Sequence, residues 1–329
     1  MRVLCGGERR AFYGPFAALV SRFAAVPHGP AHWPEQSPVR HRTRARIIPP
    51  MPAPKLVVKP VAEPIKVISA MAVPRAMILA AGRGARMRPL TDATPKPLLE
   101  VRGKPLIEWH LEALARGGVR EVVINTAWHE EQIVAALGDG ARWGMAIRYS
   151  MEGRDHGGAL ETAGGIAAAL PLLVEHADDA FWLVSGDIFA PDFVFEAQAL
   201  QRFRDGSAWA HLWLVPNPPY HPQGDFGLDA SGHGLADTAD PASVGGASWT
   251  YANLALCRAA LCRPVAPGTR AALAPLLFDA MRQRRITAEV YGGAWENVGT
   301  PAQLDALNGG PEVRPGGDLR DARRANPEL

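Results

Sequence analysis

From residue 76 onward, apolar positions recur with two spacings that alternate along the chain. Runs of five or six apolar residues are typical of buried strands, and apolar residues three and four positions apart are typical of helices that pack on one face. The stretch PLIEWHLEALARGG, for example, begins with Pro and ends with Gly, as helices prefer. The pattern predicts strands at 76–80, 121–125, 146–150, 180–185 and 210–215, and helices at 105–118, 130–137 and about 161–170.

The order of these elements predicts an α/β fold. Strands that alternate with helices form βαβ units, whose strands lie parallel in one sheet. After residue 215 the pattern changes, because the stretches 224–229 and 248–257 flank a polar, Gly-rich segment and are typical of antiparallel strands. A helix at 271–284 and a strand at 286–291 follow. We therefore expect a mixed, mainly parallel sheet in a core domain that spans 75–308.

The leader, residues 1–74, differs in composition from this core. Residues 1–75 contain 12 Lys and Arg against 3 Glu, whereas the remainder contains 23 basic and 30 acidic residues. The leader is rich in Pro and Arg and has no sustained period, so we expect it to be disordered. Three explanations of this composition are open: a targeting segment, a nucleic-acid-binding arm, and a start codon assigned too far upstream of the true start at Met71 or Met77. We favour the last. The polar tail, 309–329, is expected to be frayed.

The overall composition excludes several classes of protein. No stretch approaches the roughly 18 to 20 unbroken apolar residues that a membrane span needs, so no membrane partner is expected. The core carries more acidic than basic residues, which argues against nucleic acid as a partner. The three cysteines, Cys5, Cys257 and Cys262, form no disulfide framework. This usage indicates a reducing compartment, and we expect the protein to be cytoplasmic.

Positive charge is concentrated directly after the first predicted strand, in LAAGRGARMRPLTDATPKP at 79–97. A glycine-rich turn between a strand and a helix exposes backbone N–H groups, which bind phosphate oxygens. Gly82 and Gly84 allow a close backbone approach, and Arg83, Arg86 and Lys96 supply charge to a polyphosphate. The alternative is a solvated basic loop, but cations packed this closely repel one another unless an anion lies among them. The stretch therefore predicts a nucleotide site.

Two common nucleotide fingerprints are excluded by spacing. The dinucleotide pattern G-x-G-x-x-G fails because Met87 stands at the third glycine position, and the P-loop pattern G-x-x-x-x-G-K-[ST] does not occur. The pattern that is present, L-A-A-G-x-G-x-R-M-x-P-L-T-x-x-x-P-K-P, resembles the nucleotidyltransferases that join a nucleoside triphosphate to a sugar 1-phosphate. The resemblance extends over nearly all of 76–307. It implies the Rossmann-like three-layer sandwich of the nucleotide-diphospho-sugar transferases.

This resemblance implies roles for the residues of the loop. In that family the loop cradles the triphosphate, so the catalytic residues would be Arg86, facing the β- and γ-phosphates, and Lys96, facing the α-phosphate or the sugar phosphate. The implied nucleotide-binding residues are Leu79, Ala80, Ala81, Gly82, Arg83, Gly84 and Arg86.

Two further segments resemble the Mg²⁺ site of the family. VSGD places Asp187 just past a buried strand, where the family holds the metal, although Gly-Asp after a strand is also common turn chemistry. A late segment reads WENVGT, with Asn297 where the family usually has Asp. Asn keeps a carbonyl oxygen for a hard cation but lacks the full negative charge. We therefore expect Asp187 and Asn297 to hold Mg²⁺, more weakly than two carboxylates would.

The sugar phosphate is expected near LETAGGI at 160–166. The resemblance implies that Glu161 and the backbone around Gly164 and Gly165 meet the sugar hydroxyls. The other interpretation of this segment is a helix N-terminus with a tight packing contact. Asn125 ends a predicted strand at the edge where ligands bind in open α/β sheets, so it is a further candidate for substrate binding.

Within the family, the chain most resembles the N-acetylmuramate α-1-phosphate uridylyltransferases of bacterial cell-wall recycling. The phrases GDGARWGMAIRYS and NPPYHPQGDF carry this likeness. It implies that Asn217, His221 and Asp225 lie near the sugar or its lactyl group. An equally good interpretation of the segment is a polar turn with a capped His. The implied partners are UTP and the sugar 1-phosphate, which react to UDP-N-acetylmuramic acid and pyrophosphate in peptidoglycan recycling.

Two other functions are compatible with these residues. The same chemistry could serve another sugar 1-phosphate, such as glucose, mannose or heptose, or phosphocholine with CTP, because base and sugar choice depend on details of the pocket. A non-catalytic nucleotide-sensing subunit belongs to a different class. Asn297 favours that class, and the intact loop with Lys96 and Asp187 argues against it. The oligomeric state is left open between monomer and homodimer.

Overall fold

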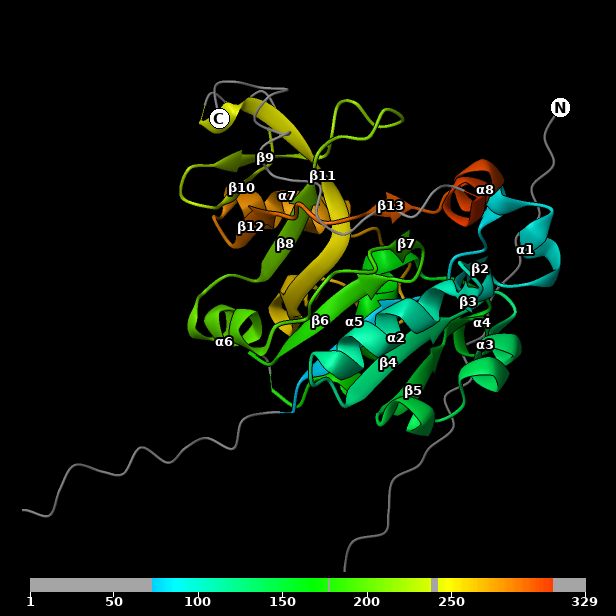
Figure 1. Cartoon of the computed structure of the whole chain (residues 1–329). Helices are drawn as coiled ribbons and strands as arrows, with labels where there is room; N and C mark the ends of the chain where they lie inside the picture. The colour runs from blue at the N-terminus through cyan, green and yellow to red at the C-terminus, as the bar shows by residue number, and fades with distance from the viewer. Residues whose placement is uncertain (1–72, 177, 238–241, 310–329) are drawn as a thin grey trace, which may run out of the picture. The chain divides into compact units, whose positions relative to one another are not determined.

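The computed structural model describes residues 73–176, 178–237 and 242–309 (Figure 1). The expected disordered leader, apart from Val73 and Pro74, and the expected frayed tail beyond its first residue lie outside the described residues. None of the helices in the described ranges is both long enough and apolar enough to cross a membrane.

Four parallel strands form one side of the main sheet. Their bounds are β1 Arg75–Leu79, β4 Glu121–Thr126, β5 Ala146–Met151 and β6 Ala180–Ser185, close to the predicted ranges. Their order across the sheet is β6, β1, β4, β5, with β5 at the edge of the sheet, and each neighbouring pair is parallel. Strands covered on both faces are expected to read as nearly continuous apolar runs, and the central strand, RAMIL, does so.

The sheet continues beyond β6 through antiparallel strands, so it is mixed, as predicted. The long strand β11 (Ser243–Arg258) pairs antiparallel with β6 through its second half and with β9 (Phe226–Asp229) through its first half. Strand β10 (Gly234–Leu235) pairs with the outer side of β9. Strand β8 (Ala210–Val215) pairs antiparallel with β11, and its other neighbour, β12 (Ile286–Val290), is parallel to it.

Helices cover both faces of this sheet. The main ones are α2 Leu106–Arg116, α3 Glu130–Leu137, α5 Glu161–Leu173, α6 Ala197–Asp205 and α7 Ala274–Arg282. Along β1, Ala76 and Ile78 belong to one hydrophobic cluster and Met77 to another, because successive side chains of a strand point to opposite faces. The first cluster includes buried residues of α2, α3 and α6, and the second those of α5 and α7. The expected three-layer sandwich is confirmed.

Short elements that the sequence pattern did not predict bring the late part of the chain against the end of β6. Strand β13 (Glu296–Asn297) pairs antiparallel with β7 (Ile188–Phe189), and helix α8 (Pro301–Gly309) follows. Val298 between them is fully buried in a small cluster with Met87. Two-residue strands are too short to show a period, so only the packing reveals them.

The other elements are short, and several predicted boundaries differ; the strand predicted at 248–257, for example, already begins at Ser243. The short elements are α1 Leu90–Ala93, α4 Glu152–His156, β2 Glu100–Val101, β3 Lys104–Pro105 and 3-10 turns at Ala85–Met87, Lys96–Leu98, Ala141–Trp143 and Ala259–Leu261. The helix predicted at 161–170 continues to Leu173 through Pro171, and the one predicted at 271–284 begins only at Ala274. Its expected first residue, Ala271, instead bonds to the start of α5 through its backbone.

Candidate active site

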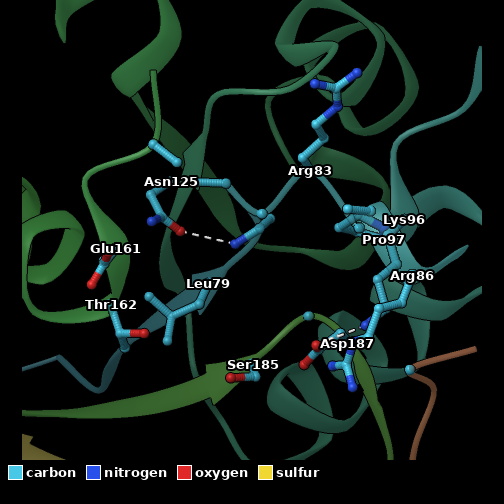
Figure 2. A pocket seen from close by; sticks show the side chains of 18 of the residues that line it. Leu79, Arg83, Arg86, Lys96, Pro97, Asn125, Glu161, Thr162, Ser185 and Asp187 are labelled. Carbon is cyan, nitrogen blue, oxygen red and sulfur yellow. Dashed lines mark hydrogen bonds and ion pairs between the residues drawn. The ribbon is translucent and has the colours of Figure 1, made fainter. Parts of the chain in front are cut away.

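A cleft opens at the edge of the sheet where β1, β4 and β6 end. Its first cavity has a volume of about 530 Å³ and is lined by the segment after β1, by Asn125 at the end of β4 and by residues 185–187 at the end of β6. Ligands bind at this edge in open α/β sheets. In Figure 2, Lys96 and Arg86 lie near Asp187 at one end of the cavity, and Asn125 and Glu161 lie at the other.

The loop after β1 presents its backbone to the first cavity. Gly84 has a φ of 64°, and a Cβ at this position would lie 3.0 Å from Thr91 Cγ2, so a side chain would be strained. The Thr91 hydroxyl donates to the Gly84 carbonyl over 2.9 Å and holds the turn. Among the described residues, no acceptor meets the N–H of Gly82 or Arg83. Such free donors form a concave site for an anion.

Lys96 and Asp187 form an ion pair in this cavity. Lys96 is only 7% exposed, and its Nζ lies 2.8 Å from Asp187 Oδ2, so the buried ammonium has the partner that it requires. Behind this pair, the buried imidazole of His110 donates from Nε2 to the Ile188 carbonyl over 2.9 Å. Burial lowers the pKa of His110 to about 4, and His110 is therefore neutral at pH 7.

Arg83 and Arg86 of the loop point in different directions. Arg86 lies beside Gly299 and, within the described part of the chain, forms no hydrogen bond or ion pair. Arg83 extends away from Lys96, and its guanidinium carbon lies 4.4 Å from the centroid of the Trp128 ring (Figure 2). An aromatic face attracts a cation at this distance. Both residues line the first cavity, and the expected contact of each with a polyphosphate stays a prediction.

Glu161 begins helix α5 in the left-handed region, with a φ of 61°. Its Oε1 lies 3.0 Å from Nε of Arg270, and both residues line the first cavity. Both side chains are well exposed, so the pair adds little to stability and either group can turn to a ligand. Arg270 was missed by the sequence analysis because it stands in a loop that matches no recognised motif.

Gly164 and Gly165 are packing positions. A Cβ at Gly164 would lie 2.3 Å from the Thr269 carbonyl oxygen, and the Gly164 N–H already donates to the Ala271 carbonyl over 3.1 Å. A Cβ at Gly165 would lie 2.5 Å from Glu152 Oε1. Gly164 lines neither the first cavity nor the second cavity described below. These contacts support the alternative interpretation of this glycine, a helix start with tight packing, and the expected contact of its backbone with a sugar stays a prediction.

Asn125 connects three elements through its amide. Its Oδ1 accepts from the Ala80 N–H over 2.9 Å, and its Nδ2 donates to Glu152 Oε1 over 2.7 Å. Glu152 is fully buried, accepts from the Leu160 N–H over 2.7 Å, and has a pKa that burial raises. Asn125 therefore supports the loop, and only its remaining N–H is open to a substrate. Glu152 itself was missed because a single Glu after a strand matches no motif.

A second cavity of about 500 Å³ adjoins the first, and Arg86 and Thr162 line both. The predicted residues His221 and Asp225 line this second cavity. Asp225 Oδ1 lies 3.0 Å from His221 Nε2, and Asp225 Oδ2 accepts from the Tyr251 N–H over 2.8 Å. These contacts hold a carboxylate and an imidazole side by side in the wall of the cavity.

The loop that carries Asp225 is held in place by neighbouring polar contacts. Asn217 donates to the Ser248 carbonyl over 3.1 Å and accepts from the Thr250 hydroxyl over 2.9 Å. Tyr220, in the same loop, donates from its hydroxyl to Glu296 Oε1 over 2.8 Å. Asn217 is not among the residues that line the second cavity, and its contacts support the loop; its expected place near the sugar stays a prediction.

The pairing of β7 with β13 brings Asp187 and Asn297 together. Asn297 lies opposite Ile188, and the Val298 N–H donates to the Asp187 carbonyl over 2.9 Å. Asn297 Oδ1 is buried and has no hydrogen-bond partner in the described chain. An amide oxygen without a partner is a ligand that a hard cation such as Mg²⁺ accepts, and this one stands on the strand that pairs next to Asp187. The described residues contain no group of three or more His, Cys, Asp or Glu around a metal position, so other oxygens would have to complete the coordination.

Comparison with known proteins adds sequence relatives. The nucleotidyl transferase family profile matches residues 75–235. The chain is 47% identical to the N-acetylmuramate alpha-1-phosphate uridylyltransferase of Neisseria meningitidis serogroup B over 232 residues, which are 70% of this chain and 95% of the relative. It is 32% identical to the protein of the same name from Caulobacter vibrioides, over 69% of this chain and 92% of the relative.

A solved structure has the same fold. A glucose-1-phosphate thymidylyltransferase structure from Bacillus anthracis, in complex with sucrose, superposes with a TM-score of 0.59. The match covers 76% of this chain and 99% of that chain, and the sequences are 19% identical. Similarity at this level of identity supports the three-layer fold alone.

Proposed function

The chain belongs to the nucleotidyl transferase family, and from that premise we propose that it joins UTP to N-acetylmuramic acid α-1-phosphate. The products are UDP-N-acetylmuramic acid and pyrophosphate. The observation that carries this proposal is the pair of adjoining cavities, one with a phosphate-binding loop and one with polar walls, which share Arg86 and Thr162. The relative from Neisseria meningitidis, similar over 95% of its length, supports the choice of UTP and of this sugar.

As a member of this family, the chain is an enzyme that transfers a nucleotidyl group to a sugar 1-phosphate. In the proposed reaction, an oxygen of the sugar phosphate attacks the α-phosphorus of UTP, a new P–O bond forms, and the bond to pyrophosphate breaks. The nucleophile is already an anion near neutral pH, because the second pKa of a phosphate monoester is about 6. No general base is needed, and catalysis depends on placing two anions together and neutralising their charge.

The first cavity offers groups for that task. The free N–H groups of the loop and the unpaired guanidinium of Arg86 would hold the β- and γ-phosphates. Lys96, fixed by its ion pair, would meet the α-phosphate or the sugar phosphate. Asp187 and Asn297 would hold Mg²⁺, which supplies positive charge to the phosphates when it is bound.

The second cavity would receive the sugar. His221 and Asp225 line its wall, and Glu161 stands in the neighbouring cavity next to Thr162, which the two cavities share. A sugar phosphate lying in the second cavity would direct its phosphate past Arg86 toward the nucleotide. This substrate would place the enzyme in peptidoglycan recycling and in the cytoplasm, where UTP is formed.

A substrate panel tests the proposal. The full chain is assayed for pyrophosphate release with UTP, CTP, GTP or dTTP against the 1-phosphates of N-acetylmuramic acid, N-acetylglucosamine, glucose, mannose and heptose, and against phosphocholine, with and without Mg²⁺. We expect the highest kcat/KM for UTP with N-acetylmuramic acid α-1-phosphate, and dependence on Mg²⁺.

Other outcomes of the panel would identify the alternatives. A higher kcat/KM for another sugar phosphate or for phosphocholine would refute the proposed substrate and leave the chemistry intact. Binding of UTP without pyrophosphate release from any pair would instead indicate a nucleotide-sensing protein.

A further inference from the structure

One guanidinium of the cleft has no task in the reaction described so far. Arg270 lines the first cavity, and its side chain is 72% exposed. Its Nε lies 3.0 Å from Glu161 Oε1, and its two terminal nitrogens form no hydrogen bond within the described residues. A guanidinium that is held at one nitrogen keeps the donors of the other two for a second anion.

Arg270 stands where the chain passes from the first cavity to the second. Residues 272–274, which follow it, line the second cavity, and Thr162, next to Glu161, lines both. The backbone of Ala271 fixes this passage through its hydrogen bonds to the start of α5. A group carried by a ligand of the second cavity can therefore reach the guanidinium of Arg270.

The partner of this arginine has a strained backbone. Glu161 adopts a φ of 61°, in the left-handed region that side chains rarely occupy. Strained residues persist where the surrounding structure fixes them, and they are frequent at binding sites. In this conformation the carboxylate of Glu161 holds Nε of Arg270, so it orients the two terminal nitrogens.

The other cationic side chains that line the two cavities have other partners or tasks. Lys96 is paired with a carboxylate over 2.8 Å, and Arg83 packs on an aromatic ring. Arg86 would hold the phosphates. His221 Nε2 lies 3.0 Å from Asp225 Oδ1, and the negative charge of that carboxylate would repel a second one. A further carboxylate on a substrate is therefore best received by the guanidinium that remains.

We propose that Arg270 selects the sugar phosphate by binding the carboxylate of its lactyl ether. N-acetylmuramic acid differs from N-acetylglucosamine by this ether on O3, whose carboxyl group is ionised at neutral pH. Two parallel N–H···O bonds join a guanidinium to a carboxylate, so the contact fixes the direction of the group as well as its charge. The inference rests on the proposed function, since it names the residue that recognises the proposed sugar.

A matched pair of substrates isolates the carboxylate. Pyrophosphate release by the full chain is measured with UTP, Mg²⁺ and either N-acetylmuramic acid α-1-phosphate or its lactyl amide, which has nearly the same shape and lacks the negative charge. The quantity compared is the ratio of kcat/KM for the acid to kcat/KM for the amide. We expect a ratio of at least about ten for the wild-type chain, because a hydrogen bond between charged groups contributes about this factor or more.

Variants of the arginine then test its role. Arg270→Gln should lower the ratio toward one, and Arg270→Lys, which keeps the charge without the parallel donors, should give an intermediate ratio. Arg263→Gln is the control, because Arg263 is exposed in the same segment, lines neither cavity and should leave the ratio unchanged. Thermal unfolding establishes that the variants are folded.

Several results would overturn the inference and leave the proposed function standing. These are a wild-type ratio near one, or an unchanged ratio in a folded Arg270→Gln variant. If Arg270→Gln does not fold, a wild-type ratio in Arg270→Lys has the same meaning. An equal fall in Arg263→Gln would show that the overall charge of the segment selects the acid, and not the position of Arg270. Absence of pyrophosphate release with both substrates would remove the inference together with the proposed function.

Discussion

Arg86 and Lys96 show how two cations in one loop differ according to their partners. Lys96 is nearly buried and is neutralised by Asp187, so part of its charge is committed within the folded chain. Arg86 has no partner among the described residues and lines both cavities. A guanidinium in that situation is available to an anion that spans the two cavities, and it can hold phosphate oxygens with two hydrogen bonds at once.

The first prediction therefore concerns Arg86. Arg86→Ala should lower kcat for pyrophosphate release by a factor of about 10² to 10³, because a preorganised group that neutralises transition-state charge is lost. The melting temperature should change little, since Arg86 makes no ion pair in the described chain. Steady-state kinetics over a range of both substrates provides the measurement.

Arg88→Ala is the matched control for this change. Arg88 lies two residues along the same loop, and its Nε pairs with Asp92 Oδ1 over 2.8 Å on the surface. Its removal should leave kcat within about twofold of wild type, because exposed pairs contribute little. Equal losses in both variants would mean that the overall charge of the loop, and not the position of Arg86, determines the rate.

At the scale of elements, the start of α5 is held by the segment before α7. The N–H groups of Ala163 and Gly164 both donate to the Ala271 carbonyl, and the Ala271 N–H donates to the Leu160 carbonyl. These three backbone hydrogen bonds place Glu161 and Arg270 beside each other at the cavity. Backbone can approach backbone this closely only where no side chain intervenes.

Gly164→Ala should therefore destabilise the protein. The new Cβ would lie 2.3 Å from the Thr269 carbonyl oxygen, so the backbone before α7 must shift. Overpacking of this kind lowers the free energy of unfolding by about 1 to 3 kcal/mol. Gly292→Ala is the control, because a Cβ there meets no atom within 4 Å. Urea unfolding of both variants gives the comparison. A Gly164→Ala variant as stable as the Gly292→Ala variant would contradict the packing role.

The contact between α2 and β7 should make stability depend on pH through His110. Its pKa is lowered to about 4 in the folded chain by burial, against about 6.5 when unfolded, so the unfolded chain binds a proton that the folded chain does not. The free energy of unfolding should therefore fall as pH decreases from 6.5 toward 4, by about 3 kcal/mol from this group. Above pH 6.5 this contribution to the free energy of unfolding should be fully retained.

His110→Gln tests this dependence. Gln can still donate to the Ile188 carbonyl but has no proton to gain, so the variant should lose about 3 kcal/mol less stability than wild type over the same pH range. Chemical unfolding at several pH values measures the two slopes. Parallel slopes would show that His110 does not cause the pH dependence.

At the scale of the whole molecule, the cleft collects residues from distant parts of the chain. The first cavity is lined by segments near residues 80, 96, 125, 160, 186, 270 and 299. A ligand that fills it connects these segments only in the folded state. Binding should therefore stabilise the whole fold by mass action.

Mg²⁺ with UTP should raise the melting temperature of the full chain. At about 100 times Kd the ligand adds about 2.7 kcal/mol, which corresponds to about 5 °C or more in a domain of this size. UTP without Mg²⁺ should give a smaller shift, as should Mg²⁺ alone. Differential scanning calorimetry measures the three shifts. No shift with any triphosphate would contradict the assignment of the first cavity to a nucleotide.

The sequence by itself determined the features that depend on neighbouring residues. The alternation of apolar runs with helical spacing predicted the four parallel strands, and the pattern around Gly82 and Gly84 predicted a turn that exposes N–H groups. A turn of this kind is built by consecutive residues, whose φ and ψ preferences are local. The loop, the fold class of the domain and the position of Asp187 at a strand end could therefore be predicted without the structure.

Only the tertiary structure decided which side chains meet in the cleft. Asn297 comes beside Asp187 through a pair of two-residue strands, and Arg270 reaches Glu161 from more than 100 residues away. The guanidinium of Arg83 packs on the ring of Trp128, which lies 45 residues further along the chain. Side-chain direction and long-range pairing result from the close packing of the whole core, in which each side chain takes the space that its neighbours leave. A pattern of neighbouring residues in the sequence therefore does not predict them.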